Sequence, residues 1–180
     1  MALGNILSQN QNAILKRWLN LIMETYPADV AALMRKDQNQ FTNPVGSTIS
    51  REIKGLFKGL LEEGNSERFS TALNSILKIR SVQDFPPSKA VGFVFLLKKA
   101  MEEILKGQIC KEPMENDWSK FLSKIDELAL HAFDIYMDCR EKVCEIRINQ
   151  AKSEREMAFR MMERMSYSKA KREKEEDPDS

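Results

Sequence analysis

The stretch DWSKFLSKIDELALHAFDIYMDCREKVCEIRINQAKSEREMAFRMMERM, residues 117–165, decides the fold. It contains neither proline nor glycine, and its apolar residues recur at alternating spacings of four and three. The series is Trp118, Leu122, Ile125, Ala129, Ala132, Tyr136, Cys139, Val143 and Ile146. A mean spacing of about 3.5 residues is the period of a coiled-coil seam. The pattern therefore predicts one long helix that pairs with a second copy of the chain.

The length of this helix constrains the architecture. At 1.5 Å per residue it would span roughly 70 Å, whereas a compact globule of this size is roughly 40 Å across. We therefore expect its first half to dock on the preceding domain and the remainder to form a dimerisation stalk. The residues expected to meet a second copy, here called the predicted seam, are Ala129, Ala132, Tyr136, Cys139, Val143 and Ile146.

A methionine stripe follows the seam after a shift of phase. It consists of Met157, Met161, Met162 and Met165. Because unbranched, polarizable methionine side chains adapt to different partners, this distal segment is a candidate partner surface. The alternative is a mobile helix end with no partner. After Met165 the sequence is charged and lacks an apolar face, which predicts disorder.

The sequence before the long helix reads as a series of shorter helices. Apolar residues fall at helical spacing and no segment alternates with a period of two, so the predicted class is all-α. The segments are residues 3–24 (open to fraying at 9–12), 28–35, a helix from Pro44, a helix from Ser66, and 89–106 with Ser88 as its cap. The last is the most apolar and is expected to cross the domain centre. A globin-like cluster and an irregular bundle both fit this series of helices. We expect one domain over residues 1–152 and a distal helix and tail over residues 153–180.

The composition excludes several classes of protein. Apolar residues make up 42% of the chain, and 28 basic residues face 27 acidic ones, so there is no basic excess for nucleic acid. The three cysteines lack CxxC spacing and read as reduced thiols in a cytoplasmic protein. No apolar run approaches the roughly 20 residues that span a bilayer, so no membrane insertion is expected.

Four stretches carry a resemblance to a known family. They are RWLNLIMETYPAD (17–29), FTNPVGSTI (41–49), RSVQDFPPSKAVGFVFLLK (80–98) and FDIYMDCREKVCEIRINQAK (133–152). In these the chain resembles the N-terminal domain of RsbR- and RsbRD-type stressosome co-antagonist proteins. The resemblance implies a globin-like sensor domain that binds no haem, takes part in stress-response regulation and dimerises through its last helix.

In the stressosome proteins that helix continues into a STAS domain, which contacts a partner kinase. Here the helix is followed by a polar tail, so we expect a stand-alone domain without a STAS-borne phosphorylation site. Output would then pass through an unidentified regulatory partner protein that recognises the dimer or its stalk. The chain is also similar to small proteins associated with dissimilatory sulfite-reduction systems.

One polar cluster beside the apolar helix is a candidate ligand or partner rim. It comprises Arg80, Gln83, Asp84, Phe85 and Ser88, with Phe93 and Phe95 next to them. The alternative is a helix-to-helix corner in which Ser88 caps, Asp84 accepts backbone amides and Arg80 pairs with a carboxylate. Capping chemistry accounts for these residue types, which favours the corner.

The remaining reactive side chains give no catalytic pattern. His131, the single histidine, lies among apolar residues of the long helix and reads as structural rather than as a haem or phosphotransfer residue. Cys139 could face its own copy and sense oxidation, but a buried cysteine more often packs as a small hydrophobe. No phosphate loop, metal-ligand spacing or nucleophile motif occurs, so no enzyme, metal or cofactor is predicted.

The sequence thus predicts a non-catalytic sensory or regulatory protein, homodimeric and cytoplasmic, that relays a signal through its C-terminal helix. Two alternatives remain open: a small-ligand-binding protein, and an accessory subunit of a redox assembly of the dissimilatory sulfite-reduction type.

Overall fold

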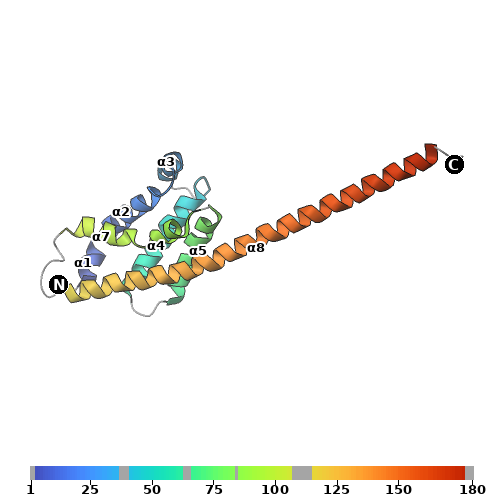
Figure 1. The fold of residues 1–180 in the computed structure, drawn as a ribbon. Helices are drawn as coiled ribbons and strands as arrows, with labels where there is room; N and C mark the ends of the chain where they lie inside the picture. Colours follow the sequence, from blue (N-terminus) through green and yellow to red (C-terminus); the bar gives the residue numbers. More distant parts are fainter. Residues whose placement is uncertain (1–2, 37–40, 63–65, 84, 107–114, 177–180) are drawn as a thin grey trace. The chain divides into compact units, whose positions relative to one another are not determined.

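The structure is a computed structural model that describes residues 3–36, 41–62, 66–83, 85–106 and 115–176. In these ranges every regular element is a helix and there is no strand. The helices (Figure 1) are α1 (Leu3–Gln9), α2 (Gln11–Met23), α3 (Ala28–Lys36), α4 (Pro44–Leu61), α5 (Ser66–Val82), α6 (Pro87–Gly92), α7 (Leu96–Leu105) and α8 (Glu115–Glu176). The predicted all-α class and the long C-terminal helix are confirmed.

The chain forms two compact units, Met1–Arg140 and Glu141–Ser180. The first holds α1 to α7 and α8 as far as Arg140, and the second holds the rest of α8. Every buried apolar side chain that the structure describes lies between Leu3 and Cys139. The hydrophobic core therefore belongs to the first unit. The boundary predicted at residue 152 stays a prediction.

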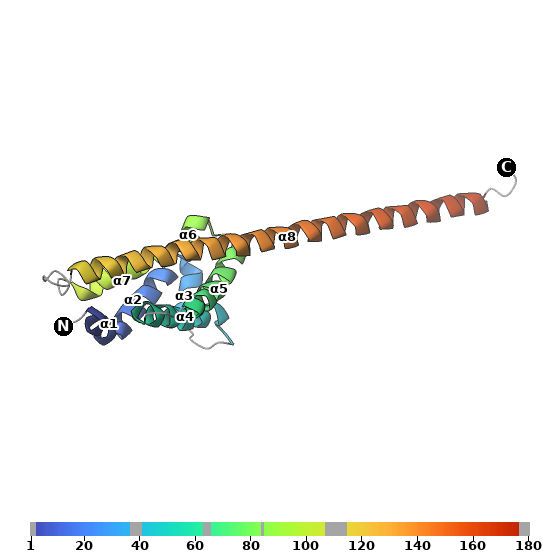
Figure 2. The same ribbon diagram turned by 90° about the horizontal axis from the view of Figure 1, so that it is seen from below.

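The core of the first unit is built by packing α4 against α5 and α2 against α7. The first part of α8 runs along this cluster, as Figures 1 and 2 show. Lys98 of α7 bonds to Asp126 of α8, Nζ to Oδ1, at 2.6 Å. Ser70 Oγ of α5 lies 3.1 Å from His131 Nε2 of α8. These contacts hold the N-terminal part of α8 against the domain, as the length argument predicted.

The predicted helix over residues 3–24 is two helices, with the break at Asn10 inside the stretch expected to fray. Both the backbone N–H of Asn10 and its side-chain Nδ2 donate to Ile6 O, at 3.1 and 2.8 Å. An asparagine amide that competes for a backbone carbonyl favours a turn over a continuing helix.

The single apolar helix predicted over residues 89–106 is wrong, because the structure has α6 and α7 separated by a tight turn. Val94 N–H donates to Val91 O at 3.1 Å and Leu97 N–H donates to Val94 O at 3.2 Å, both three residues back. The predicted Ser88 cap is also wrong. Pro87 is the first residue of α6, where its missing N–H costs nothing, and Ser88 is an exposed residue inside the helix.

The disorder predicted after Met165 is wrong for residues 166–176, because α8 continues to Glu176. This stretch is rich in lysine and glutamate, both strong helix formers, and the next proline is Pro178. At the other end α8 begins at Glu115, so Asp117 lies in its first turn and favours the positive end of the helix dipole.

Candidate functional site

A buried arginine stands at the centre of the predicted rim. Arg80, in the last turn of α5, has no exposed surface. Its guanidinium carbon lies 5.3 Å from the ring centroid of Tyr26, 4.8 Å from that of Phe85 and 5.3 Å from that of Phe93. These distances are in the range of cation–π contact. Residues from the ends of α2, α5 and α6 thus form an aromatic cage around one cation.

The hydrogen bonds of Arg80 go to neutral acceptors. Nη1 donates to Lys89 O of α6 at 2.9 Å, and Nη2 donates to Thr25 Oγ1 at 3.0 Å. Nε is buried and has no hydrogen-bond partner among the described residues. The expected pairing with a carboxylate is absent from this part of the chain, and Asp84, the nearest acid in the sequence, lies outside it. We call Thr25, Tyr26, Arg80, Phe85 and Phe93 the Arg80 cluster.

Burial sets the ionisation of this cluster. It lowers the pKa of the Arg80 guanidinium, with the nearby Tyr26 side chain acting in the opposite direction. It raises the pKa of the Tyr26 hydroxyl, and the positive Arg80 partly offsets that rise. An arginine remains charged at neutral pH, so a neutral tyrosine faces a buried cation. The ring faces and the two acceptors supply the stabilisation that water would otherwise give.

Two side chains of α8 bind the same corner. Tyr136, which is 1% exposed, donates its hydroxyl to Phe85 O at 3.0 Å. Arg140 Nη1 donates to Ser81 O at 3.1 Å. The residues joining α5 to α6 are therefore fixed from one side by Arg80 and from the other by α8.

The structure brings four of the predicted rim residues together: Arg80, Gln83, Phe85 and Phe93. Gln83 is exposed, yet its Oε1 accepts the Tyr26 hydroxyl at 3.2 Å. Phe93 is buried at 1% exposure, and Phe85 meets Tyr26 edge to face with centroids 5.1 Å apart. Arg80 and Phe93 are inaccessible to a ligand in this arrangement.

The other predicted rim residues lie apart from the Arg80 cluster. Phe95 is 46% exposed and its ring is 5.8 Å from Lys98 Nζ, on the α7 side. Ser88 is exposed on α6. Asp84 is outside the described residues. The rim as one ligand-binding surface stays a prediction, and the side chains at its centre form a packed corner.

Four residues of the predicted seam pack inside their own chain. Ala129, Ala132, Tyr136 and Cys139 are between 0% and 7% exposed and belong to the hydrophobic core of the first unit. The heptad pattern is real at these positions, but its apolar face is covered by the domain. These four residues are covered by their own domain, and a contact between copies at these positions stays a prediction.

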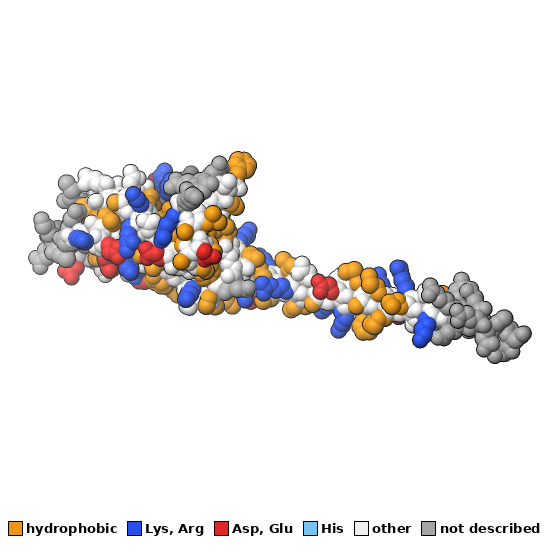
Figure 3. Space-filling model, turned by 90° about the horizontal axis from the view of Figure 1, so that it is seen from above, with side chains coloured by type: hydrophobic (Ala, Val, Ile, Leu, Met, Phe, Trp, Pro, Cys, Tyr) orange, Lys and Arg blue, Asp and Glu red, His pale blue; other side chains and the backbone are white. Residues whose placement is uncertain are grey.

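The rest of the predicted seam and the methionine stripe lie in the second unit. Val143 is half-buried and Ile146 is 57% exposed. All four stripe residues are exposed: Met157, Met161, Met162 and Met165. Figure 3 shows hydrophobic side chains interleaved with basic ones along this distal helix. These surfaces are open within their unit, and their partners stay a prediction.

The sequence did not identify Thr25 and Tyr26 as site residues, and it assigned Tyr136 to the predicted seam rather than to this corner. Thr25 and Tyr26 lie 54 or more positions before Arg80, and Tyr136 lies 51 positions after Phe85. Local spacing carries no sign of such long-range hydrogen bonds. The only available signal was that Tyr26 and Tyr136 both fall within stretches that carry the family resemblance.

The described residues contain no group of three or more histidine, cysteine, aspartate or glutamate side chains placed to hold a metal ion. His131 is exposed and bonded to Ser70. Cys139 is buried and Cys144 is exposed, and neither forms a disulfide. None of the helices in the described ranges combines the length and apolarity that crossing a bilayer requires.

The chain matches a family model, the RsbT co-antagonist protein RsbRD N-terminal domain, over residues 12–150. It therefore belongs to this family, whose members are regulatory signalling domains. A similar protein is an uncharacterized protein of Archaeoglobus fulgidus, 30% identical over 109 residues, which cover 60% of this chain and 68% of the relative. No solved structure matches the chain.

Proposed function

We propose that the protein is a non-catalytic regulator that pairs with a second copy through α8 and relays the packing state of the Arg80 cluster to a partner protein. Membership of a family of regulatory signalling domains supports the regulatory role. The observation that carries the relay is the pair of hydrogen bonds from Tyr136 and Arg140 to the carbonyls of Phe85 and Ser81. Through them α8 follows any movement of the corner.

The pairing surface is proposed to differ from the predicted seam in the first unit. Next to the buried face, α8 exposes Leu130, Phe133 and Met137, spaced three and four residues apart. Beyond Arg140, the residues at spacings of four and three from Cys144 are Ile148, Ala151, Arg155, Ala158, Met162 and Met165, apolar except for Arg155. A stripe with this period suits a coiled-coil contact between copies.

Sedimentation velocity of the full chain tests the pairing. We expect a dimer at micromolar concentration. The double variant Leu130→Lys/Met137→Lys should dissociate, because it places charges in the apolar contact. Leu33→Lys on α3 is the matched control, since Leu33 is also a strongly exposed leucine, and it should stay dimeric. A wild-type chain that stays monomeric at hundreds of micromolar would refute the pairing.

Hydrogen exchange of the dimer tests the relay. The double variant Tyr136→Phe/Arg140→Gln removes both donors to the corner with little change of size. We expect altered amide exchange between residues 141 and 165, and no such change in the control Lys142→Gln, an exposed residue of the same helix. Unaltered distal exchange in the double variant, with the dimer intact, would refute the relay while leaving the pairing standing.

Small-ligand binding is a second candidate function. The observation that favours it is a cleft between α2, α3 and α4, away from the Arg80 cluster.

A further inference from the structure

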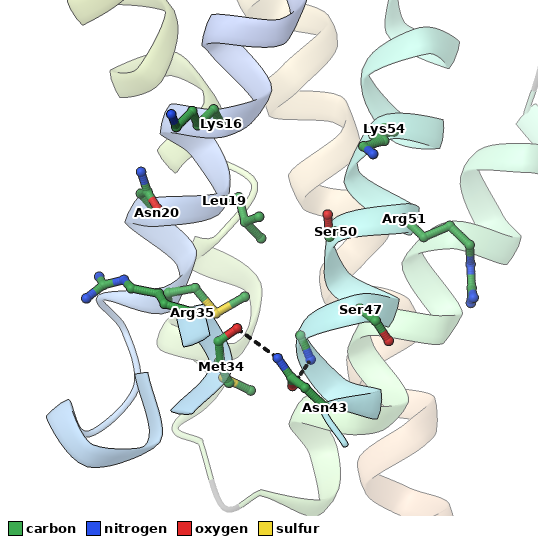
Figure 4. Close-up of a pocket in the computed structure, with 12 residues that line it drawn as sticks. Lys16, Leu19, Asn20, Met34, Arg35, Asn43, Ser47, Ser50, Arg51 and Lys54 are labelled. Carbon is green, nitrogen blue, oxygen red and sulfur yellow. Dashed lines mark hydrogen bonds between the residues drawn. The ribbon is translucent and has the colours of Figure 1, made fainter. Parts of the chain in front are cut away.

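A cleft of about 460 Å³ lies between α2, α3 and the first half of α4 (Figure 4). Sites for small molecules in proteins commonly have volumes of about 300–1,000 Å³. Leu19 of α2 and Ser50 of α4 stand on its opposite sides in Figure 4. The cleft lies wholly within the first unit. It is therefore large enough for a ligand of modest size.

The inner surface of the cleft is apolar and its frame is fixed. Met23 and Met34 line it with 3% and 8% exposure, beside the half-buried Leu19. Asn43 locks the lower end, since Nδ2 donates to Met34 O at 2.8 Å and Oδ1 accepts Gly46 N–H at 2.8 Å. The same amide ties the end of α3 to the start of α4, so the cleft is preformed rather than a gap between loose helices.

Gly46 keeps this lower end open. A Cβ at this position would come within 2.4 Å of the Asn43 side chain. Any larger residue would displace the amide that joins α3 to α4. The cleft and its asparagine lock therefore depend on the absence of a side chain here.

The mouth of the cleft is positively charged. Four basic side chains line it, Lys16, Arg35, Arg51 and Lys54, and no acidic side chain does. Arg51 is paired with Glu52 at 2.8 Å and points away from the cleft in Figure 4, where the ends of Lys16 and Arg35 also point away from α4. The other three have no ion-pair partner within the described residues. Since the whole chain carries only +1, this concentration of positive charge is local.

We propose that the cleft binds a small amphipathic anion, with its carboxylate or phosphate group held at the mouth by Lys54, near the positive charges of Lys16 and Arg35, and its apolar part against Met23 and Met34. Ser50, half-buried on α4, supplies a hydroxyl that faces the cleft. A neutral apolar ligand would leave the basic mouth unused. A nucleic acid would need a longer basic surface than three side chains supply.

The cleft is connected to the Arg80 cluster through the end of α2. Tyr26 N–H donates to Met23 O at 3.1 Å, and Thr25 N–H donates to Ile22 O at 3.0 Å. A ligand that moves Met23 acts on the turn that carries two members of the Arg80 cluster. An effect of the ligand on α8 rests on the proposed function, whereas binding in the cleft does not.

Titration of the ¹⁵N-labelled full chain, followed by NMR, tests the binding. The probes are decanoate below its micelle-forming concentration, phenyl phosphate, decan-1-ol and decyltrimethylammonium. We expect saturable shifts of the Asn20, Gly46 and Ser50 amides with one or both anions, and none of comparable affinity with the alcohol or the cation. Whether decanoate or phenyl phosphate binds more tightly distinguishes a carboxylate from a phosphate ligand.

Two variants separate the charge from the cavity. Lys54→Gln should weaken binding of the anion about tenfold, the effect of losing one charge-assisted contact. Lys58→Gln, one turn further along α4 and outside the cleft, is the matched control and should bind as the wild type. Ser50→Phe should fill the cleft and abolish the shifts without altering its charge, with circular dichroism confirming the fold.

Three results would overturn the proposal. The first is the absence of saturable shifts in the cleft with either anion. The second is equal binding of decan-1-ol and decanoate. The third is equal loss of binding in Lys54→Gln and Lys58→Gln. Binding in the cleft without any change in α8 exchange would leave this proposal standing and count against the relay.

Discussion

At the scale of single residues, Arg80 is the one charged side chain that is buried among the described residues. A buried charge is stable only where hydrogen bonds and favourable electrostatics replace its hydration. Arg80 has one carbonyl, one hydroxyl and three ring faces, while its Nε has no partner among the residues described. Because these contacts come from four separate segments, one guanidinium fixes the relative positions of α2, α5, α6 and the turn before α7.

Replacing Arg80 with lysine should destabilise the protein by about 3 kcal/mol, although the charge is kept. An ammonium cannot reach both acceptors or stack on the rings as a planar guanidinium does, and Lys89 O would lose its partner. Urea unfolding followed by circular dichroism measures the change. Arg35→Lys, at an exposed position, is the control and should alter the free energy of unfolding by less than about 0.5 kcal/mol. Equal effects would contradict the role assigned to Arg80.

A second residue-scale prediction concerns the pKa of Glu103. Arg17 donates to its carboxylate through Nε and, at 3.2 Å, through Nη2, and this hydrogen bonding lowers the pKa of Glu103 below its ordinary value of 4.5. Because the pKa is lower in the folded state, the stabilisation is present above pH 4.5 and is lost as the pH falls through the lowered value.

An NMR pH titration of the side-chain carboxyl carbons measures this shift. Glu103 should titrate below pH 4.5, and Arg17→Gln should return its pKa toward 4.5. The variant should also show less loss of stability on acidification than the wild type. A Glu103 pKa that is the same in both proteins would show that the ion pair between α2 and α7 does not form in solution.

The sequence identified Arg80, Phe85 and Phe93 as a group because they occur close together in a stretch rich in polar and aromatic residues. It could not show that Arg80 points inward, since helix periodicity places it at the end of α5 without fixing which neighbours cover it. Tyr26 was missed, and Tyr136 was assigned to the predicted seam instead, because their contacts with the corner join segments more than 50 residues apart.

At the scale of elements, the break between α6 and α7 is a feature that the hydrophobic pattern did not predict. Residues 89–106 carry no proline, and their one glycine, Gly92, is the last residue of α6, where it weakens the helix without by itself ending it. The turn frees the carbonyl of Phe93, which accepts the buried indole N–H of Trp18 at 2.7 Å. A tertiary hydrogen bond thus stabilises a break that propensity alone would not produce.

Trp18→Phe should therefore lower the free energy of unfolding by more than the loss of side-chain volume alone would. It leaves the Phe93 carbonyl without its partner in the core, which adds about 2 kcal/mol to the cost of the smaller ring. Trp118→Phe, at a half-buried site with no hydrogen bond shown for its indole, should cost clearly less. Equilibrium unfolding of both variants measures the difference. Similar costs would mean that the indole N–H adds nothing to the stability of the turn.

The periodicity of α8 correctly indicated that one face of the helix is covered, but it did not indicate which surface covers that face. A seam of period 3.5 shows that a helix face is covered, but the covering surface can belong to the same chain or to another copy. Ala129, Ala132, Tyr136 and Cys139 face their own domain. The size of the preceding domain did indicate that the first half of α8 must dock on it, while the position at which docking ends required the structure.

At the scale of the whole molecule, the buried core belongs to the first unit, whereas the second unit carries part of the proposed contact with another chain. All buried apolar side chains of the described residues precede Glu141, whereas residues 141–169 of the second unit are exposed apart from the half-buried Val143. A single helix with an exposed surface gains little from burial. The second unit is therefore expected to be ordered chiefly by contact with another chain, which gives the proposed pairing a thermodynamic reason.

Ending the chain after Arg140 should leave the stability of the fold nearly unchanged and weaken the pairing of the two copies. The truncated protein keeps every buried core residue that the structure describes and the Arg140 bond to Ser81 O, so its free energy of unfolding per monomer should fall by no more than about 1 kcal/mol. Its dimer should dissociate more readily, because the proposed pairing residues between Cys144 and Met165 are removed. Urea unfolding at several protein concentrations, together with sedimentation velocity, measures both quantities. If the truncated chain fails to fold, the second unit contributes to the core; if it pairs as tightly as the full chain, the contact lies entirely at Leu130, Phe133 and Met137 or elsewhere in the first unit.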